Sequence, residues 1–285
     1  MDKRVQCLII IHGAVLLFSM SGLFGKFLDI SATLIVFGRT AFATFSLAFV
    51  LHILKIPVKY RNRRDLLFFF MMGGILAIHW VTFFHSIQIS TVAVGLISFS
   101  SFPIFVTFLE PLFFNERLHL RDIAVSMVVF AGLVMVIPDF DISNNLTRGV
   151  LWGTVSGLTF ALLSILNRKY IAQGYSSLAV AFYQDGVACL LLFPFVGRDI
   201  LGLTLYDAAM IGILGVVFTA LAHTLFIQGM AGVKAALAGV ISCLEPVYGT
   251  LFAIMFFQEI PSVRMVAGGT VILAGVYYAT AKARV

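Results

Sequence analysis

The sequence predicts an all-α membrane protein of ten transmembrane helices, arranged as two inverted five-helix repeats with both termini in the cytoplasm. Three observations predict it: apolar runs of membrane-spanning length, a one-sided distribution of Lys and Arg, and an internal repeat. Of the 285 residues, 61% are hydrophobic and 11% are charged, whereas soluble domains are about 45–50% apolar and about 25% charged. This composition excludes a disordered chain, a fibrous protein and a water-soluble enzyme of ordinary make-up.

Apolar runs of similar length recur along the whole chain. A bilayer core about 30 Å thick requires about 20 residues of apolar helix. The expected spans are 5–25, 32–54, 66–88, 92–114, 122–138, 149–167, 177–196, 207–229, 235–258 and 263–281. Lys3 and Arg4 precede the first run as they would a signal peptide, but this run carries His12, is long and lacks a clear cleavage site. We therefore expect it to be retained as a helix.

The basic residues in the loops fix the expected orientation, because Lys and Arg concentrate on the cytoplasmic side of membrane proteins. With the N-terminus inside, the cytoplasmic side holds Lys3, Arg4, Lys55, Lys59, Arg61, Arg63, Arg64, Arg117, Arg121, Arg168, Lys169, Lys234, Lys282 and Arg284. The outer side holds only Lys26, Arg148, Arg198 and Arg264. The net charge of +6 thus reflects topology rather than nucleic-acid binding. The cluster from Lys55 to Arg64 is foremost a topogenic loop, and contact with anionic membrane lipids is the alternative.

The second half of the chain repeats the first at an offset of 143 residues. FPIFVTFLEPLFFNE (102–116) aligns with EPVYGTLFAIMFFQE (245–259), and VVFAG (128–132) aligns with VILAG (271–275). One fixed offset across several spans indicates a duplicated unit.

We expect the two units to be residues 1–142 and 143–285. Each contains five spans, and an odd number of spans places the second copy upside down in the membrane. Inverted repeats are typical of secondary transporters, whose binding site lies near the midplane between the repeats.

These features together resemble the drug/metabolite transporter superfamily, in particular its EamA family. The resemblance rests on Pro103 to Glu116 and Pro246 to Glu259, each a proline-containing fourth helix that ends at a glutamate, and on the AG-containing helices that follow at 123–137 and 263–281. It covers nearly the whole chain. It implies a permease in the bacterial inner (plasma) membrane that works by alternating access, but it does not identify the substrate, because members carry amino acids, metabolites, quaternary amines or nucleotide-linked compounds.

Charged residues inside the spans are the first candidates for a site, since each costs at least about 2.5–3.5 kcal/mol to insert. Glu245 is the strongest, because it lies near the middle of its span, beside Pro246, on a polar stripe with Ser242 and Tyr248. It could be the counter-charge of a cationic substrate or a proton carrier. The alternative is a buried carboxylate satisfied by Arg39 or by hydroxyls. The first repeat has Phe102 at the equivalent position.

The other charged residues within spans are Arg39, Glu110 and Asp185. Aligning FGRT (37–40) with FYQD (182–185) pairs Arg39 with Gln184. An Arg39–Asp185 salt bridge and a substrate role for both residues remain equal alternatives. Glu110 shares a helical face with Ser98 and Phe102, which suggests an inner vestibule.

Histidines and aromatic residues complete the candidate set. His79 and His85 are about 120° apart around one helix, so a joint metal site is not expected. His223 follows Thr219 by one helical turn, and proton coupling is the functional alternative to packing for these histidines. Aromatic faces can hold quaternary ammonium groups, although for each ring a packing role competes. The rings that adjoin the polar positions are Trp80, Phe83, Phe99, Phe102, Tyr183 and Tyr248.

The predicted substrate-binding residues are Glu245, Tyr248, Ser242, Trp80, His79, Phe102, Tyr183, Asp185, Arg39 and His223, with Glu110 and Ser98 in a vestibule. No catalytic residue, metal site or cofactor is expected: the three cysteines show no metal spacing, and no HExxH, GxSxG or P-loop motif is present.

The leading function is an exporter or exchanger of a small polar metabolite such as an amino acid or amine, with protons as a candidate coupling ion. A proton-coupled exporter of quaternary amines or drugs is the alternative, and a membrane-embedded enzyme lies outside the class. The chain is expected to act as a monomer or a homodimer.

Overall fold

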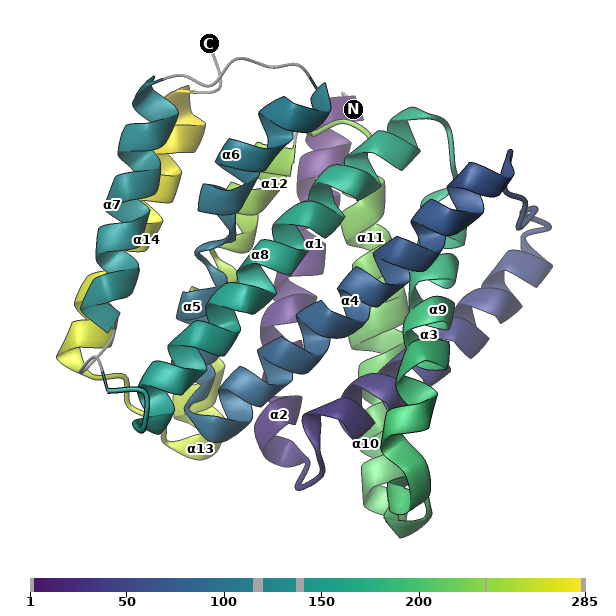
Figure 1. Ribbon diagram of the computed structural model, residues 1–285, viewed down its shortest axis with the longest axis horizontal. Helices are drawn as coiled ribbons and strands as arrows, with labels where there is room; N and C mark the ends of the chain where they lie inside the picture. The colour runs from purple at the N-terminus through teal and green to yellow at the C-terminus, as the bar shows by residue number, and fades with distance from the viewer. Residues whose placement is uncertain (1–2, 115–119, 137–140, 234, 283–285) are drawn as a thin grey trace.

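The computed structural model describes residues 3–114, 120–136, 141–233 and 235–282, and within these ranges every regular element is a helix (Figure 1). In this described part of the chain, seven helical segments are long and apolar enough to cross a membrane: 3–27, 32–53, 63–89, 92–114, 145–172, 177–202 and 205–229. Three shorter apolar segments cover 123–135, 245–257 and 263–275. The protein is therefore an all-α, multi-pass membrane protein, as the composition predicts.

The helices follow the expected spans closely. The first half contains α1 (Lys3–Ser21), α2 (Phe24–Phe27), α3 (Ala32–Ile53), α4 (Arg63–Ile89), α5 (Val92–Phe99), α6 (Phe102–Phe114) and α7 (Leu120–Val136). The second half contains α8 (Asn145–Ala172), α9 (Ser177–Val196), η1 (Gly197–Gly202), α10 (Leu205–Gly215), η2 (Val216–Leu221), α11 (Ala222–Gly229), α12 (Ala235–Ser242), α13 (Glu245–Phe257) and α14 (Val263–Lys282).

Polar side chains cap several of the helices where the chain turns back. Ser31 accepts from the amide of Leu34 at the start of α3, and Asn62 accepts from the amide of Asp65 at the start of α4. Each such cap satisfies an amide that the helix cannot bond and contributes about 1 kcal/mol. The sequence thus encodes the helix starts with residues that would weaken a helix interior.

Two expected spans are broken rather than continuous. The span 92–114 is interrupted at Ser100 and Ser101, and the span 235–258 is interrupted between α12 and α13. A proline has no amide to donate and clashes with the carbonyl four residues earlier. Those earlier residues are Phe99 for Pro103 and Ser242 for Pro246, which are the last residues of α5 and α12. The prolines therefore place the breaks.

The span 205–229 contains a wider, π-helical turn, η2, between α10 and α11. The Thr219 hydroxyl donates to the carbonyl of Leu214, five residues earlier, at 2.8 Å. Such bulges leave backbone carbonyls without their usual helical partners and are frequent at functional sites. This one becomes important because an arginine from α3 occupies it.

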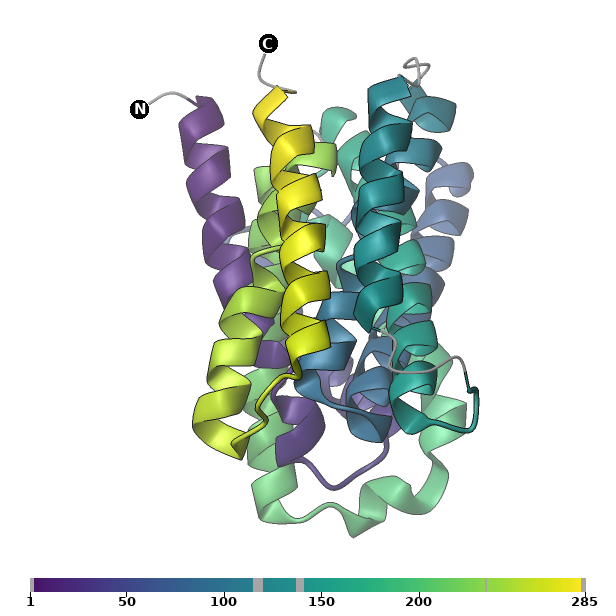
Figure 2. The ribbon, with the colours of Figure 1, turned by 90° about the vertical axis from the view of Figure 1, so that its left-hand side faces the viewer.

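The helices pack into a bundle in which distant segments are neighbours. α4 packs against α8 and α9, α3 against α9 and α10, α1 against α11, and α7 against α14. Figures 1 and 2 show that α1 begins and α14 ends at the same end of the molecule. From their breaks, α6 runs toward that end and α13 runs away from it (Figure 1). The two broken helices are thus antiparallel.

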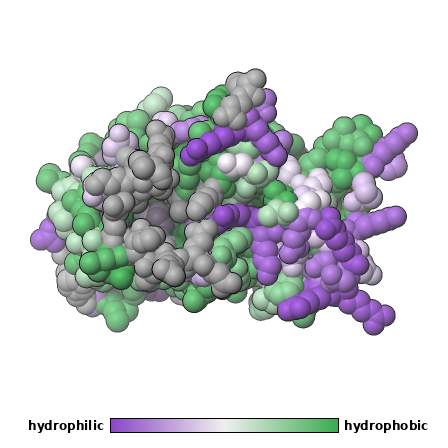
Figure 3. Space-filling view, turned by 90° about the horizontal axis from the view of Figure 1, so that it is seen from above, coloured by the Kyte–Doolittle hydropathy of each residue, from purple (hydrophilic) through white to green (hydrophobic). Residues whose placement is uncertain are grey.

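The surface has two kinds of region. Large apolar side chains such as Phe45, Leu190 and Phe195 are exposed along the helices, as expected for side chains that face lipid. Figure 3 views the end where α1 begins, and hydrophilic residues gather over one side of it. The loop from Lys55 to Arg64 joins α3 to α4 at that end and is almost wholly exposed.

Candidate functional site

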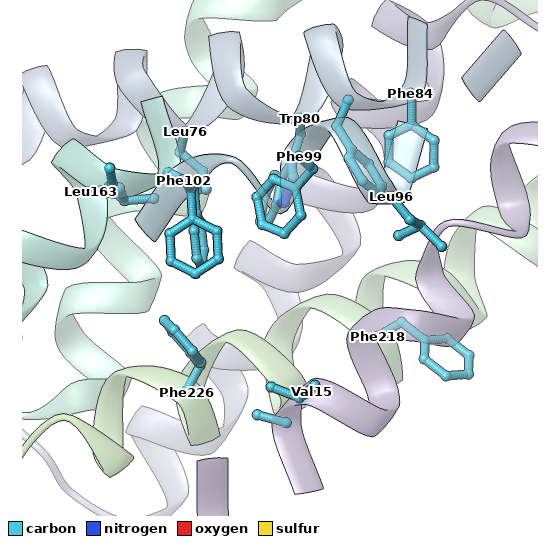
Figure 4. Close-up of a cluster of buried hydrophobic side chains, with 14 of the residues drawn as sticks. Val15, Leu76, Trp80, Phe84, Leu96, Phe99, Phe102, Leu163, Phe218 and Phe226 are labelled. Atoms are coloured by element: carbon cyan, nitrogen blue, oxygen red, sulfur yellow. The ribbon is translucent and has the colours of Figure 1, made fainter. Parts of the chain in front are cut away.

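A narrow cavity lies between helices of both halves, near the breaks in the spans. It is lined by Phe18, Ser21, Arg39, Leu76, His79, Trp80, Phe83, Phe99, Phe160, Leu163, His223 and Glu245. The centres of water-sized molecules can occupy about 30 Å³ of it, which suffices for water. A bound metabolite needs a far larger space, so the helices must separate to admit one. Figure 4 shows Leu76, Trp80, Phe99 and Phe102 facing Phe226 across this region.

Arg39 is the fixed positive charge of the cavity. Its Nε donates to the Thr219 hydroxyl at 2.8 Å and its Nη2 to the carbonyl of Phe218 at 3.3 Å, both in the η2 turn. Its guanidinium lies 4.0 Å from the centroid of the Trp80 ring. The side chain is 1% exposed. A guanidinium suits this position because it can donate in one plane while it stacks on an aromatic face.

Glu245 is the first residue of α13 and points into the same cavity. It is buried, and it interacts electrostatically with Arg39. The free amides at a helix N-terminus favour a negative charge there. The break that Pro246 causes thus places a carboxylate at a position that an unbroken helix would not stabilise.

His79 is held rigidly in the wall of the cavity. Its Nδ1 lies 2.8 Å from the Ser156 hydroxyl and 3.0 Å from the Ser156 carbonyl oxygen. The Ser156 hydroxyl also donates to the backbone carbonyl of His79. This link joins α4 to α8, and the rings of Phe99 and Phe160 lie close to the imidazole.

His223 and Asp185 lie on neighbouring helices, α11 and α9. His223 Nδ1 is 3.7 Å from Asp185 Oδ2, and Asp185 is wholly buried. The edge of the His223 ring meets Trp80, with centroids 5.5 Å apart. Among the described groups within ion-pair distance, Asp185 thus faces His223, whereas Arg39 is bonded to the η2 turn. Asp185 still acts on Arg39 electrostatically, but at longer range.

Five of the predicted site residues line the cavity together: Arg39, His79, Trp80, His223 and Glu245. Asp185 lies directly behind His223. The structure therefore brings the two predicted charged residues together with His79, Trp80 and His223 around one cavity, with contributions from four helices.

Other predicted binding residues lie outside the cavity lining. Phe102 is stacked on Phe99, with centroids 5.3 Å apart, and Tyr183 is stacked on Phe69 at 4.6 Å. The Ser242 hydroxyl donates to the carbonyl of Ala238. Tyr248 is half-buried on α13, away from the lining. These four side chains pack between helices in this conformation.

The two predicted vestibule residues have structural neighbours. Glu110 is ion-paired with Arg168 of α8, whose guanidinium also lies 4.1 Å from the centroid of the Phe114 ring. Ser98 is buried, and if Gly153 carried a Cβ atom, that atom would lie only 2.6 Å from the Cβ of Ser98. Neither residue lines the cavity. The close approach at Gly153 shows how tightly α5 packs against α8.

Sequence reasoning missed several lining residues. They are Phe18, Ser21, Leu76, Phe160 and Leu163. Apart from Ser21, these residues are apolar within apolar spans, so their sequence positions resemble those of lipid-facing residues. The rings of Phe18 and Phe160 both meet that of Phe226, and Phe160 also meets Phe99 and Phe102. These contacts are visible only in the structure.

A second polar group closes the bundle at the end opposite the start of α1 (Figure 1). Lys26 lies 3.9 Å from Glu259, and its ammonium donates to the carbonyl of Ser90 at 2.9 Å. The Glu259 carboxylate also accepts from the amide of Val92, the first residue of α5. We call these contacts the Lys26–Glu259 closure. The equivalent glutamate of the first repeat, Glu116, lies outside the described residues.

Comparison with known proteins finds similar sequences and a similar fold. Residues 6–137 and 147–281 match the model of the EamA-like transporter family. An uncharacterized transporter of Archaeoglobus fulgidus is 29% identical over 68% of this chain and 69% of its own. An S-adenosylmethionine uptake transporter of Rickettsia bellii is 26% identical over 74% of this chain and 68% of its own. A crystal structure at 18% identity covers 99% of both chains with a TM-score of 0.71, which supports the fold.

Proposed function

Since the chain belongs to the EamA-like transporter family, whose members are transporters and not enzymes, we propose that it is a secondary active transporter of a small polar organic metabolite. It works by alternating access, and the cavity between its halves is the substrate site. The single observation that carries this proposal is the buried set Arg39, Glu245, His79 and His223 around one narrow cavity. A charged side chain within a membrane span is costly to insert, so such residues usually bind a ligand or pair with one another.

The proposal includes a pair of inverted repeats, residues 1–142 and 143–285. Four helix bounds support it, because α5 (92–99) and α6 (102–114) coincide with α12 (235–242) and α13 (245–257) when 143 is added. Two contacts join residues that are 143 apart: the Trp80 ring meets the His223 ring, and the Cys243 thiol donates to the backbone carbonyl of Ser100. A residue meets its own equivalent only near a symmetry axis. The opposite directions of α6 and α13 favour an axis in the membrane plane.

The membrane orientation is part of the same proposal. The end where α1 begins also carries the exposed basic loop from Lys55 to Arg64, and basic loops face the cytoplasm. We therefore place both termini in the cytoplasm and the protein in a plasma membrane. Epitope tags at either end should be inaccessible in intact cells. Labelling of one end from outside would contradict an even number of spans.

The charges of the cavity favour a substrate that carries a positive group. Glu245 faces the cavity, Asp185 lies behind His223, and Arg39 alone opposes them as a fixed cation. The aromatic walls of Trp80, Phe83 and Phe99 suit an ammonium or sulfonium group. S-adenosylmethionine, amino acids and amines all fit this description, and several relatives transport the first. Export of quaternary amines or drugs is the second candidate, favoured by the same aromatic walls.

Exchange in proteoliposomes tests the proposal. Vesicles loaded with an unlabelled compound are given the same radiolabelled compound outside, for S-adenosylmethionine, amino acids, polyamines and quaternary amines in turn. We expect accumulation of at least one compound by the wild type and loss of that accumulation in Glu245→Gln. Wild-type accumulation in a Glu245→Gln protein of normal stability would contradict the assigned site, and no accumulation of any compound would contradict the substrate class.

A further inference from the structure

Asp185 and His223 form a buried acid–base pair that the substrate site leaves unexplained. Asp185 is 0% exposed and His223 is 3% exposed. The 3.7 Å between His223 Nδ1 and Asp185 Oδ2 is slightly too long for a hydrogen bond. His223 forms part of the cavity wall, whereas Asp185 lies behind it. The pair is thus in contact with the cavity through His223, while Asp185 is separated from the cavity by that side chain.

The polar atoms of this pair are unusual in having no partner. Among the described residues, neither carboxylate oxygen of Asp185 and neither ring nitrogen of His223 has a hydrogen-bond partner. Buried polar groups are almost always hydrogen-bonded, and a buried carboxylate without a partner is costly. A proton added to the imidazole would make both ring nitrogens of His223 donors, and a small shift of either side chain would let Nδ1 donate to Asp185 Oδ2. That contact would be a charge-assisted hydrogen bond, which is shorter and stronger than a neutral one.

The surrounding charges favour a bound proton. The charged and titratable groups near the pair come from three helices: Asp185 interacts electrostatically with Arg39 of α3 and Cys189 of α9, and His223 with His79 of α4. Glu245 of α13 interacts with Arg39. With both carboxylates ionised and the imidazoles neutral, two negative charges face the single charge of Arg39. One added proton makes the cluster neutral, which a low-dielectric interior strongly favours.

We propose that Asp185 and His223 together bind the proton that is exchanged during transport, at a site distinct from the substrate-facing Glu245. The proton enters from water in the cavity, binds His223 Nδ1 and is shared with Asp185 Oδ2, and it leaves by the same route. No other bond forms or breaks. The role in transport rests on the proposed function, whereas proton binding by the pair does not.

Trp80 provides a direct reporter of this proton. Its ring lies 5.5 Å from that of His223, edge to face, and a protonated imidazole in contact with an indole quenches its fluorescence by accepting an excited-state electron. The protein has two tryptophans, and the other, Trp152, lies 5.5 Å from His85 in a similar arrangement. His85 has no acidic partner recorded within the described residues. The chain thus supplies a matched control.

The test is a fluorescence titration of the purified full-length protein in lipid nanodiscs, from mildly alkaline to acidic pH. In Trp152→Phe protein, which reports on Trp80, acid should quench the fluorescence, His223→Gln should abolish the quench, and His79→Gln should retain it. Asp185→Asn removes the neighbouring carboxylate and should make the quench at a given acidic pH smaller than in the Trp152→Phe parent.

In Trp80→Phe protein, which reports on Trp152, Asp185→Asn should have no effect. A Trp80 fluorescence that does not depend on pH would overturn the site. So would an acid quench of Trp80 that is the same in the parent protein, in Asp185→Asn and in Asp185→Glu.

A transport measurement separates this proposal from the proposed function. In proteoliposomes, an imposed pH gradient should accelerate wild-type flux of whichever compound is exchanged, and the ratio of flux with and without the gradient should fall to about one in Asp185→Asn. A gradient that leaves wild-type flux unchanged would overturn the coupling role. If no compound is exchanged at all, the proposed function fails, and the fluorescence titration still decides whether the pair binds a proton.

Discussion

The two halves of the molecule share a backbone plan but supply opposite charges to the cavity. The first half contributes the cation, Arg39, and the aromatic platform beneath it, Trp80. The second half contributes both carboxylates, Asp185 and Glu245. The helix breaks that frame the cavity occur at equivalent positions in both halves. The comparison teaches that the two proposed repeats keep equivalent helix breaks while a few residues at equivalent positions differ in chemistry.

The contrast is sharpest at one pair of equivalent residues. Phe102 begins α6 and Glu245 begins α13, each directly after a break. Phe102 is wholly buried among Phe99 and Phe160, whereas Glu245 lines the cavity. The same backbone position thus serves as packing in one half and as a candidate ligand in the other. An asymmetric substrate requires this kind of difference between otherwise similar halves.

The largest expected effect comes from removing the cation of the first half. Arg39→Ala leaves two buried carboxylates without their fixed counter-charge and the Phe218 carbonyl without its donor. Loss of one partner from a buried charged group costs about 3–5 kcal/mol. We expect a marked fall in the thermal unfolding temperature of the detergent-purified protein. Arg39→Lys keeps the charge and should lower the unfolding temperature less. Equal unfolding temperatures for the wild type and both variants would contradict the role of Arg39 as counter-charge to the two carboxylates.

The next effect distinguishes the two equivalent positions. Glu245→Gln should lower exchange by about 10- to 100-fold, the loss expected when a charged hydrogen-bond partner worth about 1.5–3 kcal/mol is removed. Phe102→Leu keeps an apolar side chain at the equivalent site and should lower exchange far less. Both rates are measured in the same proteoliposome assay, normalised to the amount of reconstituted protein. A reversed order of the two effects would break the comparison between the halves.

A smaller effect concerns the closed end of the bundle. Glu259→Ala removes the acceptor of the Val92 amide and the partner of Lys26, a loss comparable to that of a helix cap, about 1 kcal/mol. The ratio of closed to open conformations should therefore fall about fivefold. Faster labelling of a cavity cysteine from that side would reveal it. Lys26→Met should act in the same direction but more weakly, because a partly exposed ion pair contributes little.

The smallest effect is a pH dependence at the opposite end. The Tyr175 hydroxyl donates to Asp65 at 2.6 Å, and burial together with this bond raises the pKa of Tyr175. The stabilisation is therefore fully present below about pH 10, the pKa of the unfolded side chain, and is lost as the pH rises through the folded value. Stability measured by chemical unfolding should decline in this alkaline range, and the decline should be shallower in Tyr175→Phe.

Much of the fold was predictable because the bilayer imposes strong constraints on a sequence. The apolar runs located the helices, and the fixed offset predicted two units, close to the two ranges that match the family model. The helix breaks were harder to predict, because Pro103 and Pro246 signal a local interruption while the apolar run continues through it. The η2 turn has no clear sequence signal at all, since it depends on Thr219 bonding backward and on Arg39 arriving from α3.

The candidate site was predictable only where a residue was anomalous. Arg39, Asp185 and Glu245 stand out because charges are rare within spans. His79 and His223 stand out for the same reason. Phe160 and Leu163 do not, because an apolar side chain in an apolar helix looks the same whether it faces lipid, another helix or a cavity. Tyr183 was predicted as an aromatic face beside polar positions, and its ring is stacked on Phe69 in this conformation.

The most direct test of the central claim is the accessibility of the cavity from the two sides of the membrane. Ser21 lines the cavity and is 4% exposed, so Ser21→Cys in a chain with Cys7, Cys189 and Cys243 replaced by alanine offers one reporter. A membrane-impermeant thiol reagent should reach it from either side, and a transported compound should slow the reaction from both. Reaction from one side only, or no protection by a transported compound, would contradict alternating access through this cavity.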